Sequence, residues 1–404
     1  MANRVVITSV GIVSSLGFST GEIVRSLEDG GAVMVPTGFE GDVWAFPIER
    51  EFDVRRFTGR CRNARYLNRG ARLCVAAAMA AVKGAEPAGH MWGRAGLFVG
   101  AGPNLDIGNE FPEIRSGAID SKSLAALWIL KFLPNTAASV IADLAGIHGE
   151  NATIGTACAA SLQAIGEAFR KIRHGNLDLA LAGGGDSRLS PGGILAYRKA
   201  RALRTGGPGR SGEYSPFSAT RAGFVPGEGG AFVVLENLEH ARSRGARIIA
   251  EIRGYGASMD GCGMTAPDPS GRWAEAAVRS ALNESGMASA RVDVVCAHGT
   301  GTVLNDAMEA DLIARVFGEH RPMVTALKSR IGHLAAACGA VELSIGLACM
   351  EHGYVPEIRH LEEPCRAGID FVLAPRSAPV STMLIQNFGF GGQNSALVVN
   401  KWEN

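Results

Sequence analysis

Residues 152–161 read Ala-Thr-Ile-Gly-Thr-Ala-Cys-Ala-Ala-Ser, and an apolar pattern continues from there to Gly175. The first residues are small or β-branched, as in a buried strand, and Gly155 and Thr156 lead into Cys158. After Cys158, apolar residues recur at helical spacing, and Gly175 supplies a helix stop. These residues are Leu162, Ile165, Ala168, Phe169 and Ile172. The stretch therefore predicts a strand, a tight elbow that carries Cys158, and a helix that begins at the elbow.

Cys158 is a candidate nucleophile because of this predicted position. A thiol at a helix N-terminus faces unpaired N–H groups and the positive end of the helix dipole. Both favour the thiolate, which is the nucleophilic form of cysteine. The stretch alone fits equally well with a small buried cysteine that has no chemical role.

Composition excludes several classes of protein. The chain has 404 residues, 47% of them hydrophobic, which suffices for one large core or two ordinary ones. Its net charge of +1 gives no sign of a nucleic-acid partner. No apolar run approaches the roughly 18 residues that span a bilayer, and no secretory signal begins the chain, so we expect a cytoplasmic protein without membrane contact. The eight cysteines form no CxxC pair, so neither a metal site nor a disulfide framework is expected.

Strand and helix patterns alternate along the chain, which predicts an α/β layered fold. Continuous apolar runs at 4–14, 96–102, 177–185 and 230–236 are typical of strands buried on both faces. From residue 247 the pattern begins again, with strand-like segments at 247–258, 292–298 and 324–333, an Ala/Gly-rich helix at 334–350 and a hairpin at 383–399. We therefore expect two similar halves, 1–246 and 247–404, with no flexible linker between them.

Three predicted strand ends carry reactive side chains. They are Cys158, His298 in the run His-Gly-Thr-Gly-Thr (298–302), and Lys328 and His333 in the run Lys-Ser-Arg-Ile-Gly-His (328–333). A single histidine is more often a core or surface residue, but these two are framed by glycine and small residues at strand ends. In a duplicated layered fold the strand ends of both halves meet, so we expect one pocket suited to covalent thioester chemistry.

Together with Asn-Phe-Gly-Phe-Gly-Gly (387–392), these motifs resemble those of the β-ketoacyl-[acyl carrier protein] synthases, over essentially the whole chain. The resemblance implies a thiolase-like fold, two similar halves in an α-β-α-β-α arrangement. It also implies an acyltransferase that carries out decarboxylative Claisen condensation, in fatty acid or type II polyketide or polyene biosynthesis.

The resemblance also implies roles for the reactive side chains. Cys158 would take an acyl group from the phosphopantetheine arm of an acyl carrier protein. His298 and His333 would stabilise the negative charge that decarboxylation of a malonyl-carrier thioester leaves behind. Lys328, together with Glu309, would orient the two histidines.

Further positions follow from the same resemblance. Backbone N–H groups of Cys158 and Phe390 would form an oxyanion hole, and the Phe390 side chain would gate the acyl pocket. Thr300 and Thr302 would hold the pantetheine arm. The remaining expected substrate contacts are Phe388, Gly389 and Gly391.

A basic run spans residues 55–72, with arginines at 55, 56, 60, 62, 65, 69 and 72. Such a run is usually a solvated face. The resemblance assigns Arg62 and Arg65 to positions that contact the acidic carrier protein, which makes that function an equal alternative. It further implies no metal and no dissociable cofactor, because the phosphopantetheine belongs to the partner. It also implies a dimer, either of identical chains or with a related ketosynthase-like subunit.

Three positions depart from the family pattern. Ser218 and Ala222 stand where the family usually has acidic residues, and Asn387 stands where it usually has a smaller residue. A buried charge network is therefore expected to be incomplete. Two other functions use a related fold, a non-catalytic chain-length factor and a thiolase acting on acyl-coenzyme A. The first lacks the nucleophile, and the second needs a cysteine near the C-terminal end, where residues 388–393 contain none.

Overall fold

The computed structural model describes residues 2–48, 51–85, 89–105, 126–207 and 213–403. The strands of the N-terminal part are β1 (Val5–Val13), β4 (Gly96–Gly100), β5 (Asn151–Ile154), β6 (Leu179–Ser187) and β7 (Glu228–Asn237). Those of the C-terminal part are β8 (Ala250–Met259), β9 (Val294–Cys296), β10 (Met323–Thr325), β12 (Asp370–Phe371), β14 (Thr382–Gly389) and β15 (Gln393–Lys401). Two short pairs lie apart, β2 (Val35–Pro36) with β3 (Trp44–Ala45) and β11 (Tyr354–Val355) with β13 (Arg376–Ser377).

The main sheet consists of two parts with the same strand order. Its order within the described ranges is β12-β10-β9-β14-β15-β8-β1-β7-β6-β4-β5. Counted outward from the junction of β1 and β8, each part has two antiparallel pairings followed by two parallel ones, and the C-terminal part adds a third parallel pairing, of β10 with β12. A short antiparallel pairing of residues 5–7 with residues 250–252 joins the parts. The repeated topology confirms the prediction of two similar halves in an α/β fold.

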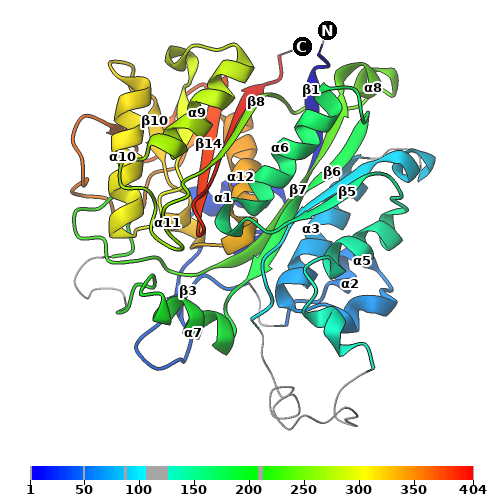
Figure 1. The fold of residues 1–404 in the computed structure, drawn as a ribbon, viewed down its shortest axis with the longest axis horizontal. Coiled ribbons are helices and arrows are strands. Elements are labelled where there is room, and N and C mark those ends of the chain that lie inside the picture. Colours follow the sequence, from blue (N-terminus) through cyan, green and yellow to red (C-terminus); the bar gives the residue numbers. More distant parts are fainter. Residues whose placement is uncertain (1, 49–50, 86–88, 106–125, 208–212, 404) are drawn as a thin grey trace.

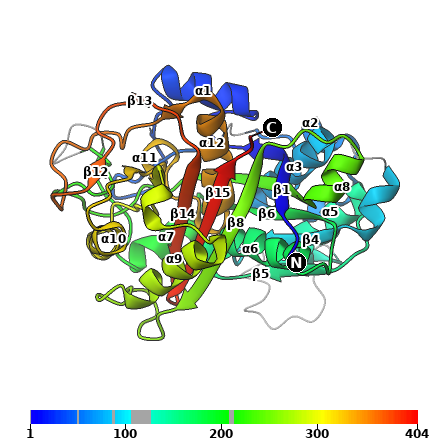
Figure 2. The ribbon, with the colours of Figure 1, turned by 90° about the horizontal axis from the view of Figure 1, so that it is seen from above.

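Helices cover the sheet in a matching way. Those of the N-terminal part are α1 (Thr20–Glu28), α2 (Arg55–Thr58), α3 (Arg69–Ala85), α5 (Thr136–Ala145), α6 (Ala160–Arg173), α7 (Pro191–Lys199) and α8 (Leu238–Ser243). Those of the C-terminal part are α9 (Arg272–Ser285), α10 (Val303–Phe317), α11 (Lys328–Ile331) and α12 (Cys338–His352). Figures 1 and 2 show α9 and α10 on one side, α3 and α5 on the other, and α6 and α12 between them. The predicted division at 246/247 falls in the segment between α8 and β8.

Successive side chains of a strand point to opposite faces of the sheet and therefore belong to different apolar cores. Three such cores separate the layers of helices and sheet. In β7, Val233 and Leu235 face the central core that contains α6 and α12, whereas Phe232 and Val234 face the outer core under α3 and α5. The strands of the C-terminal part alternate in the same way between the central core and a third core under α9 and α10. Because both faces of β1, β4, β6 and β7 are buried, these strands read as continuous apolar runs. The result is the expected α-β-α-β-α order.

The strand–elbow–helix unit predicted around Cys158 occurs twice. A 3₁₀ turn at Ala157–Ala159 leads from β5 into α6, and a 3₁₀ turn at Ala335–Ala337 leads into α12. Each turn begins with an alanine at φ +48°, a conformation that costs an L-residue about 1 kcal/mol or more. The same strained start in both halves places Cys158 in the first elbow, two residues before α6.

Glycines allow strands to approach the two central helices closely. A Cβ atom added to Gly100 in β4 would lie 2.4–2.6 Å from backbone atoms of Ala160 and Ser161, the first residues of α6. No rotation of a side chain can relieve a clash with backbone. Gly100 therefore sets the distance between β4 and the helix that follows Cys158.

We predict that Gly100→Ala lowers the free energy of unfolding by about 3 kcal/mol, because β4 must move away from α6. Urea denaturation followed by circular dichroism measures the change. Gly21→Ala is the matched control, since a Cβ at Gly21 in α1 meets no atom within 4 Å. Equal stability of the two variants would contradict the assigned packing.

Candidate active site

Cys158 lies in the elbow before α6 and is 9% exposed. The backbone N–H of Phe390 donates a hydrogen bond to its sulfur. Burial raises the pKa of the Cys158 thiol to about 11, although the charge of Lys328 and the Phe390 N–H act in the opposite direction. The expectation that the helix N-terminus stabilises the thiolate is therefore wrong for the free protein. Desolvation outweighs the helix end, and the sulfur is protonated at neutral pH.

His298 and His333 come from the C-terminal half, His298 after β9 and His333 after α11. Both are buried, and their ring centroids are 5.7 Å apart at an interplanar angle of 82°. Burial and the charge of Lys328 lower the pKa of His333 to about 3 and that of His298 well below its ordinary value. Both imidazoles are therefore neutral, and each can donate one N–H hydrogen bond.

The protonated nitrogen of each ring follows from the partner of the other nitrogen. The backbone N–H of Ala335 donates to His333 Nδ1 at 3.0 Å, so the proton of His333 is on Nε2. Lys328 Nζ lies 3.2 Å from His298 Nδ1, and an ammonium group can only donate, so His298 also carries its proton on Nε2. The site thus holds two neutral Nε2–H donors.

Lys328 is paired with Glu342 rather than with the predicted Glu309. Its Nζ donates to Glu342 Oε1 at 2.5 Å and to the carbonyl oxygen of His298 at 2.7 Å, and both side chains are fully buried. Burial lowers the pKa of Lys328, but the Glu342 carboxylate more than offsets this and holds it above its ordinary value. Sequence reasoning missed Glu342. The available signal was a single carboxylate within the otherwise apolar helix 338–350, which needs a buried counter-charge.

Glu309 holds the loop that carries His298. Its carboxylate accepts the backbone N–H groups of His298 at 2.6 Å and Gly299 at 2.8 Å, and the Gln386 amide at 2.7 Å. Burial raises the pKa of Glu309 to about 7. Glu309 accepts hydrogen bonds from backbone and amide groups, so it orients His298 through the main chain and not through Lys328.

Thr300 and Thr302 lie in the same loop. Their hydroxyl groups are hydrogen-bonded to each other at 2.9 Å. Asp306 fixes the loop by accepting the backbone N–H groups of Thr300 and Gly301, each at 3.0 Å. Thr302 is partly exposed and Thr300 is buried, so only part of the predicted pantetheine-binding pair reaches the surface.

The loop after β14 lies against the elbow of Cys158. Phe388 is buried with its ring centroid 5.8 Å from that of His298, and Phe390 is partly exposed. A Cβ at Gly389 would lie 3.0 Å from the backbone nitrogen of Cys158, so the loop approaches the elbow without a side chain between them. Gly391 has φ +83°, a left-handed conformation that favours glycine. The structure thus brings the predicted loop residues and Cys158 together.

The departures at Ser218 and Ala222 leave Arg221 with other partners. Its guanidinium donates to the carbonyl oxygens of Ser218, Thr302 and Val303, and it lies 3.9 Å from Asp306. These contacts of Arg221 fasten the loop before α10.

The arginines of the basic run at residues 55–72 lie in different environments. Arg62 and Arg65 are exposed on one 3₁₀ turn, with Arg65 stacked over the Tyr66 ring. Arg69 forms a two-point ion pair with the buried Glu228, both contacts at 2.6 Å. Arg69 therefore does not belong to a solvated face, whereas Arg62 and Arg65 lie at the surface.

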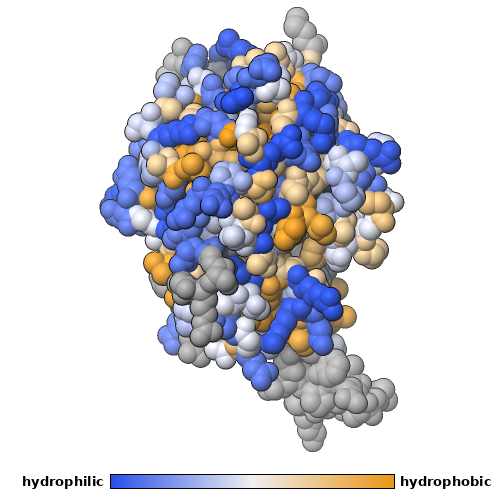
Figure 3. Space-filling view, turned by 90° about the vertical axis from the view of Figure 1, so that its left-hand side faces the viewer, coloured by the Kyte–Doolittle hydropathy of each residue, from blue (hydrophilic) through white to orange (hydrophobic). Residues whose placement is uncertain are grey.

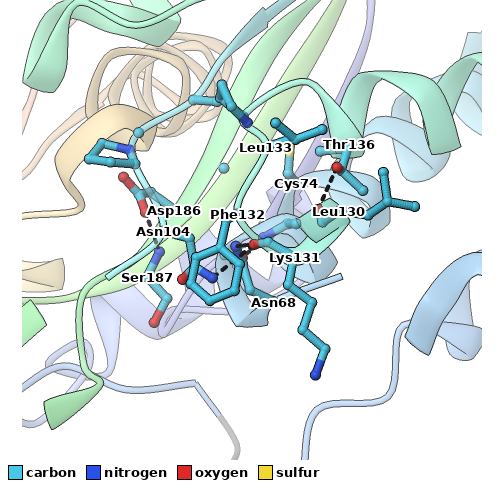
Figure 4. Close-up of a pocket in the computed structure, with 18 of the residues that line it drawn as sticks. Asn68, Cys74, Asn104, Leu130, Lys131, Phe132, Leu133, Thr136, Asp186 and Ser187 are labelled. Atoms are coloured by element: carbon cyan, nitrogen blue, oxygen red, sulfur yellow. Dashed lines mark hydrogen bonds between the residues drawn. The ribbon is translucent and has the colours of Figure 1, made fainter. Parts of the chain in front are cut away.

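A pocket between α3, β4, β6 and the segment before α5 lies next to this site (Figure 4). Side-chain amides of Asn68 and Asn104 donate to the Lys131 carbonyl oxygen at 3.1 and 2.8 Å, while the Lys131 side chain points away from them. At the inner end, Asp186 accepts the backbone N–H of Ala336 at 3.2 Å and pairs with Arg188 at 2.8 Å. Asp186 thus joins the pocket to the Ala335–Ala337 turn that follows His333.

Three further observations concern the surface, possible metal ligands and possible membrane spans. On the face seen from the α10 side, hydrophilic side chains predominate and apolar ones form separate groups (Figure 3). Among the described residues, no group of three or more His, Cys, Asp or Glu side chains is arranged to hold a metal ion. No helix in the described ranges combines the length and apolar character needed to cross a bilayer.

Because burial raises the pKa of Cys158 to about 11, we predict that its alkylation by iodoacetamide accelerates about tenfold per pH unit up to about pH 10. Only the thiolate reacts, and its fraction grows with pH throughout this range. Peptide mass spectrometry at Cys158 measures the rate, with Cys158→Ala as the control for assignment. A rate that levels off below about pH 8 would show a low pKa and contradict this electrostatic description.

Comparisons with known proteins place the chain in a family. Residues 2–241 match the family described as "Beta-ketoacyl synthase, N-terminal domain", and residues 249–362 match "Beta-ketoacyl synthase, C-terminal domain". A 3-oxoacyl-[acyl-carrier-protein] synthase 2 of Coxiella burnetii is 33% identical over 98% of both chains. The solved ishigamide ketosynthase/chain length factor has a TM-score of 0.90 at 29% identity over the full length of both chains.

A third similarity is to a type II PKS ketosynthase solved in complex with its acyl-carrier protein, with a TM-score of 0.86 and 26% identity over the full length of both chains. The matched family domains cover most of the sequence, and the fold agrees throughout. The chain belongs to the β-ketoacyl synthase family.

Proposed function

We propose that this protein is a β-ketoacyl-[acyl carrier protein] synthase in which Cys158 is the nucleophile and His298 and His333 promote decarboxylation. The observation that carries the proposal is a contact between the halves: the elbow of Cys158 lies against the Ala335–Ala337 turn that follows His333 and against the end of β14, where Phe388 packs beside His298. Both histidines are neutral Nε2–H donors. In the sequence, Cys158 lies more than a hundred positions before either histidine. A purely structural role would not require two neutral imidazoles beside a cysteine.

In the first half-reaction, the Cys158 sulfur attacks the thioester carbonyl of an acyl-phosphopantetheine. A new carbon–sulfur bond forms, and the pantetheine sulfur leaves and takes up the proton of the Cys158 thiol. The N–H groups of Cys158 and Phe390 stabilise the negative oxygen of the intermediate, at roughly 3 kcal/mol per donor. The Phe390 N–H is already directed at the Cys158 sulfur.

In the second half-reaction, the bond between the malonyl carboxylate and its neighbouring carbon breaks and releases carbon dioxide. The electron pair moves onto the thioester as an enolate, whose oxygen accepts hydrogen bonds from both Nε2–H groups. Two neutral donors suit this role because neither has to lose or gain a proton. The enolate carbon then attacks the acyl-Cys158 carbonyl, and the Cys158 sulfur leaves and is protonated.

The proposed partner is an acyl carrier protein, which supplies the phosphopantetheine, so the enzyme needs no cofactor of its own. Arg62 and Arg65 are exposed cations on one turn and would contact an acidic carrier surface. Support also comes from the similar ketosynthase that is seen with its acyl-carrier protein.

A second subunit is the other proposed partner. Strand β5 is the last strand of the sheet, and its backbone is paired on one side, with β4. Its residues are exposed or half-buried. Such an edge is suited to pairing with an identical chain or with a related ketosynthase-like chain. We propose the cytoplasm as the site of this activity.

We predict that incubation with an acyl-carrier protein adds one acyl mass to the protein, because the thioester transfers to Cys158. Intact-protein mass spectrometry over a panel of acyl chain lengths measures the adduct. Cys158→Ala is expected to form none. Condensation by Cys158→Ala, or an adduct that it retains, would contradict the assigned nucleophile.

We predict that His333→Ala decarboxylates malonyl-carrier protein about a hundredfold more slowly than the wild type, because one enolate donor is lost. Release of labelled carbon dioxide measures the rate. His320→Ala serves as the matched control, since His320 contacts the carbonyl oxygen of Val292 outside the site. Decarboxylation by His333→Ala at the wild-type rate would exclude the two-histidine mechanism.

A further inference from the structure

His298 has a second side-chain partner besides Lys328. Asn387, which precedes the Phe388–Gly392 loop on β14, is fully buried. Its Nδ2 lies 3.2 Å from His298 Nδ1 and 2.7 Å from Glu342 Oε2. The other oxygen of the same carboxylate binds Lys328. Glu342 therefore connects the two groups that approach His298 Nδ1.

The orientation of the Asn387 amide follows from Glu342. The Glu342 carboxylate is paired with the Lys328 ammonium group through Oε1 and is therefore ionised, so its Oε2 can only accept and the NH₂ group of Asn387, not the amide oxygen, faces it. The same NH₂ group has a second hydrogen, which is directed to His298 Nδ1. Lys328 also offers only hydrogens, so two independent donors converge on this one nitrogen.

The orientation of the Asn387 amide lowers the stability of the folded protein, because it leaves the amide oxygen without a partner among the described residues. Asn387 Oδ1 has no hydrogen-bond donor in the described part of the chain. It lies over Gly339 of α12, where a Cβ would be only 2.4 Å away. A buried amide oxygen without a donor costs about 1–3 kcal/mol. A side chain without an amide oxygen would avoid that cost, so the contacts of the NH₂ group are the compensating feature.

The two histidines are therefore held by different means. His333 Nδ1 is bonded to a backbone N–H, which no substitution at another side chain removes. His298 Nδ1 is bonded to side chains alone. Only the orientation of His298 can thus be set by the identity of residue 387.

We propose that Asn387 is a positioning residue for the decarboxylation step, which together with Lys328 and Glu342 holds the His298 ring with its Nε2–H directed into the site. The inference rests on the proposed function. It concerns the half-reaction that uses the histidines and not the transfer of the acyl group to Cys158.

The test compares Asn387→Leu with Asn394→Leu. Both asparagines are buried on the β14–β15 hairpin, and both donate to a carboxylate, Asn387 to Glu342 and Asn394 to Asp260. Only Asn387 touches His298. Asn387→Leu is expected to slow decarboxylation of malonyl-carrier protein about tenfold and to leave acylation of Cys158 within about twofold of wild type. Asn387→Ser, which is smaller and cannot overfill the site, is expected to act in the same direction.

A spectroscopic readout tests the same contact without catalysis. In protein labelled with ¹⁵N-histidine, loss of one donor is expected to move the His298 Nδ1 resonance towards that of an unbonded ring nitrogen in Asn387→Leu. Asn394→Leu is expected to leave it in place. The missing signal in His298→Asn assigns the resonance.

Unchanged decarboxylation in both Asn387 variants, or equal slowing of both half-reactions as in a merely destabilised protein, would overturn the inference. An unmoved Nδ1 resonance would overturn it too. Failure of the wild type to decarboxylate malonyl-carrier protein is a different result, because it would refute the proposed function itself.

Discussion

The contact between the first turns of α6 and α12 is the constraint on which the site depends. The hydroxyl oxygen of Ser161 in α6 accepts the backbone N–H of Ala340 in α12 at 3.0 Å. A Cβ at Gly339 would lie 2.5 Å from the side chain of Leu162, so the two helices touch nearly backbone to backbone. Each helix follows a strained elbow of its own half. Fixing the helix ends together therefore brings Cys158 and His333 into one site.

The electrostatics of the site follow from its burial between the two parts of the main sheet. Lys328 and Glu342 are both fully buried, and each is acceptable there only because the other compensates its charge. Burial, assisted by the positive charge of Lys328, lowers the pKa of both imidazoles and keeps them neutral. The site thus has two donors that need no proton exchange with solvent, which is the property that enolate stabilisation requires.

Much of the fold and of the site could be predicted from the sequence, because both depend on local residue spacing and on short motifs. The strand–elbow–helix around Cys158 follows from residue spacing, and the second half follows from its repetition. The residues that bring His298, Lys328 and His333 to strand ends are also visible as short motifs. The family resemblance then supplies the roles that spacing alone leaves open.

The remainder depends on contacts between distant segments. Glu342 is the partner of Lys328 because α12 runs beside α11, and Glu309 instead binds the backbone of the His298 loop. The protonated state of Cys158 results from the depth of burial, which a helix start in the sequence does not reveal. The hydrogen bonds of Asn387 require the position of β14 beside α12, so the sequence shows only an unusually large side chain at that position.

The central claim is that the two halves of the chain supply one site in which acyl transfer and decarboxylation combine to form a carbon–carbon bond. A single-turnover experiment tests it most directly. Protein acylated on Cys158 is mixed with malonyl-carrier protein, and both the Cys158 adduct and the carrier-bound products are quantified. The account predicts loss of the adduct with formation of one equivalent of β-ketoacyl-carrier protein. Persistence of the adduct, or its release as free acid without a lengthened product, would contradict it.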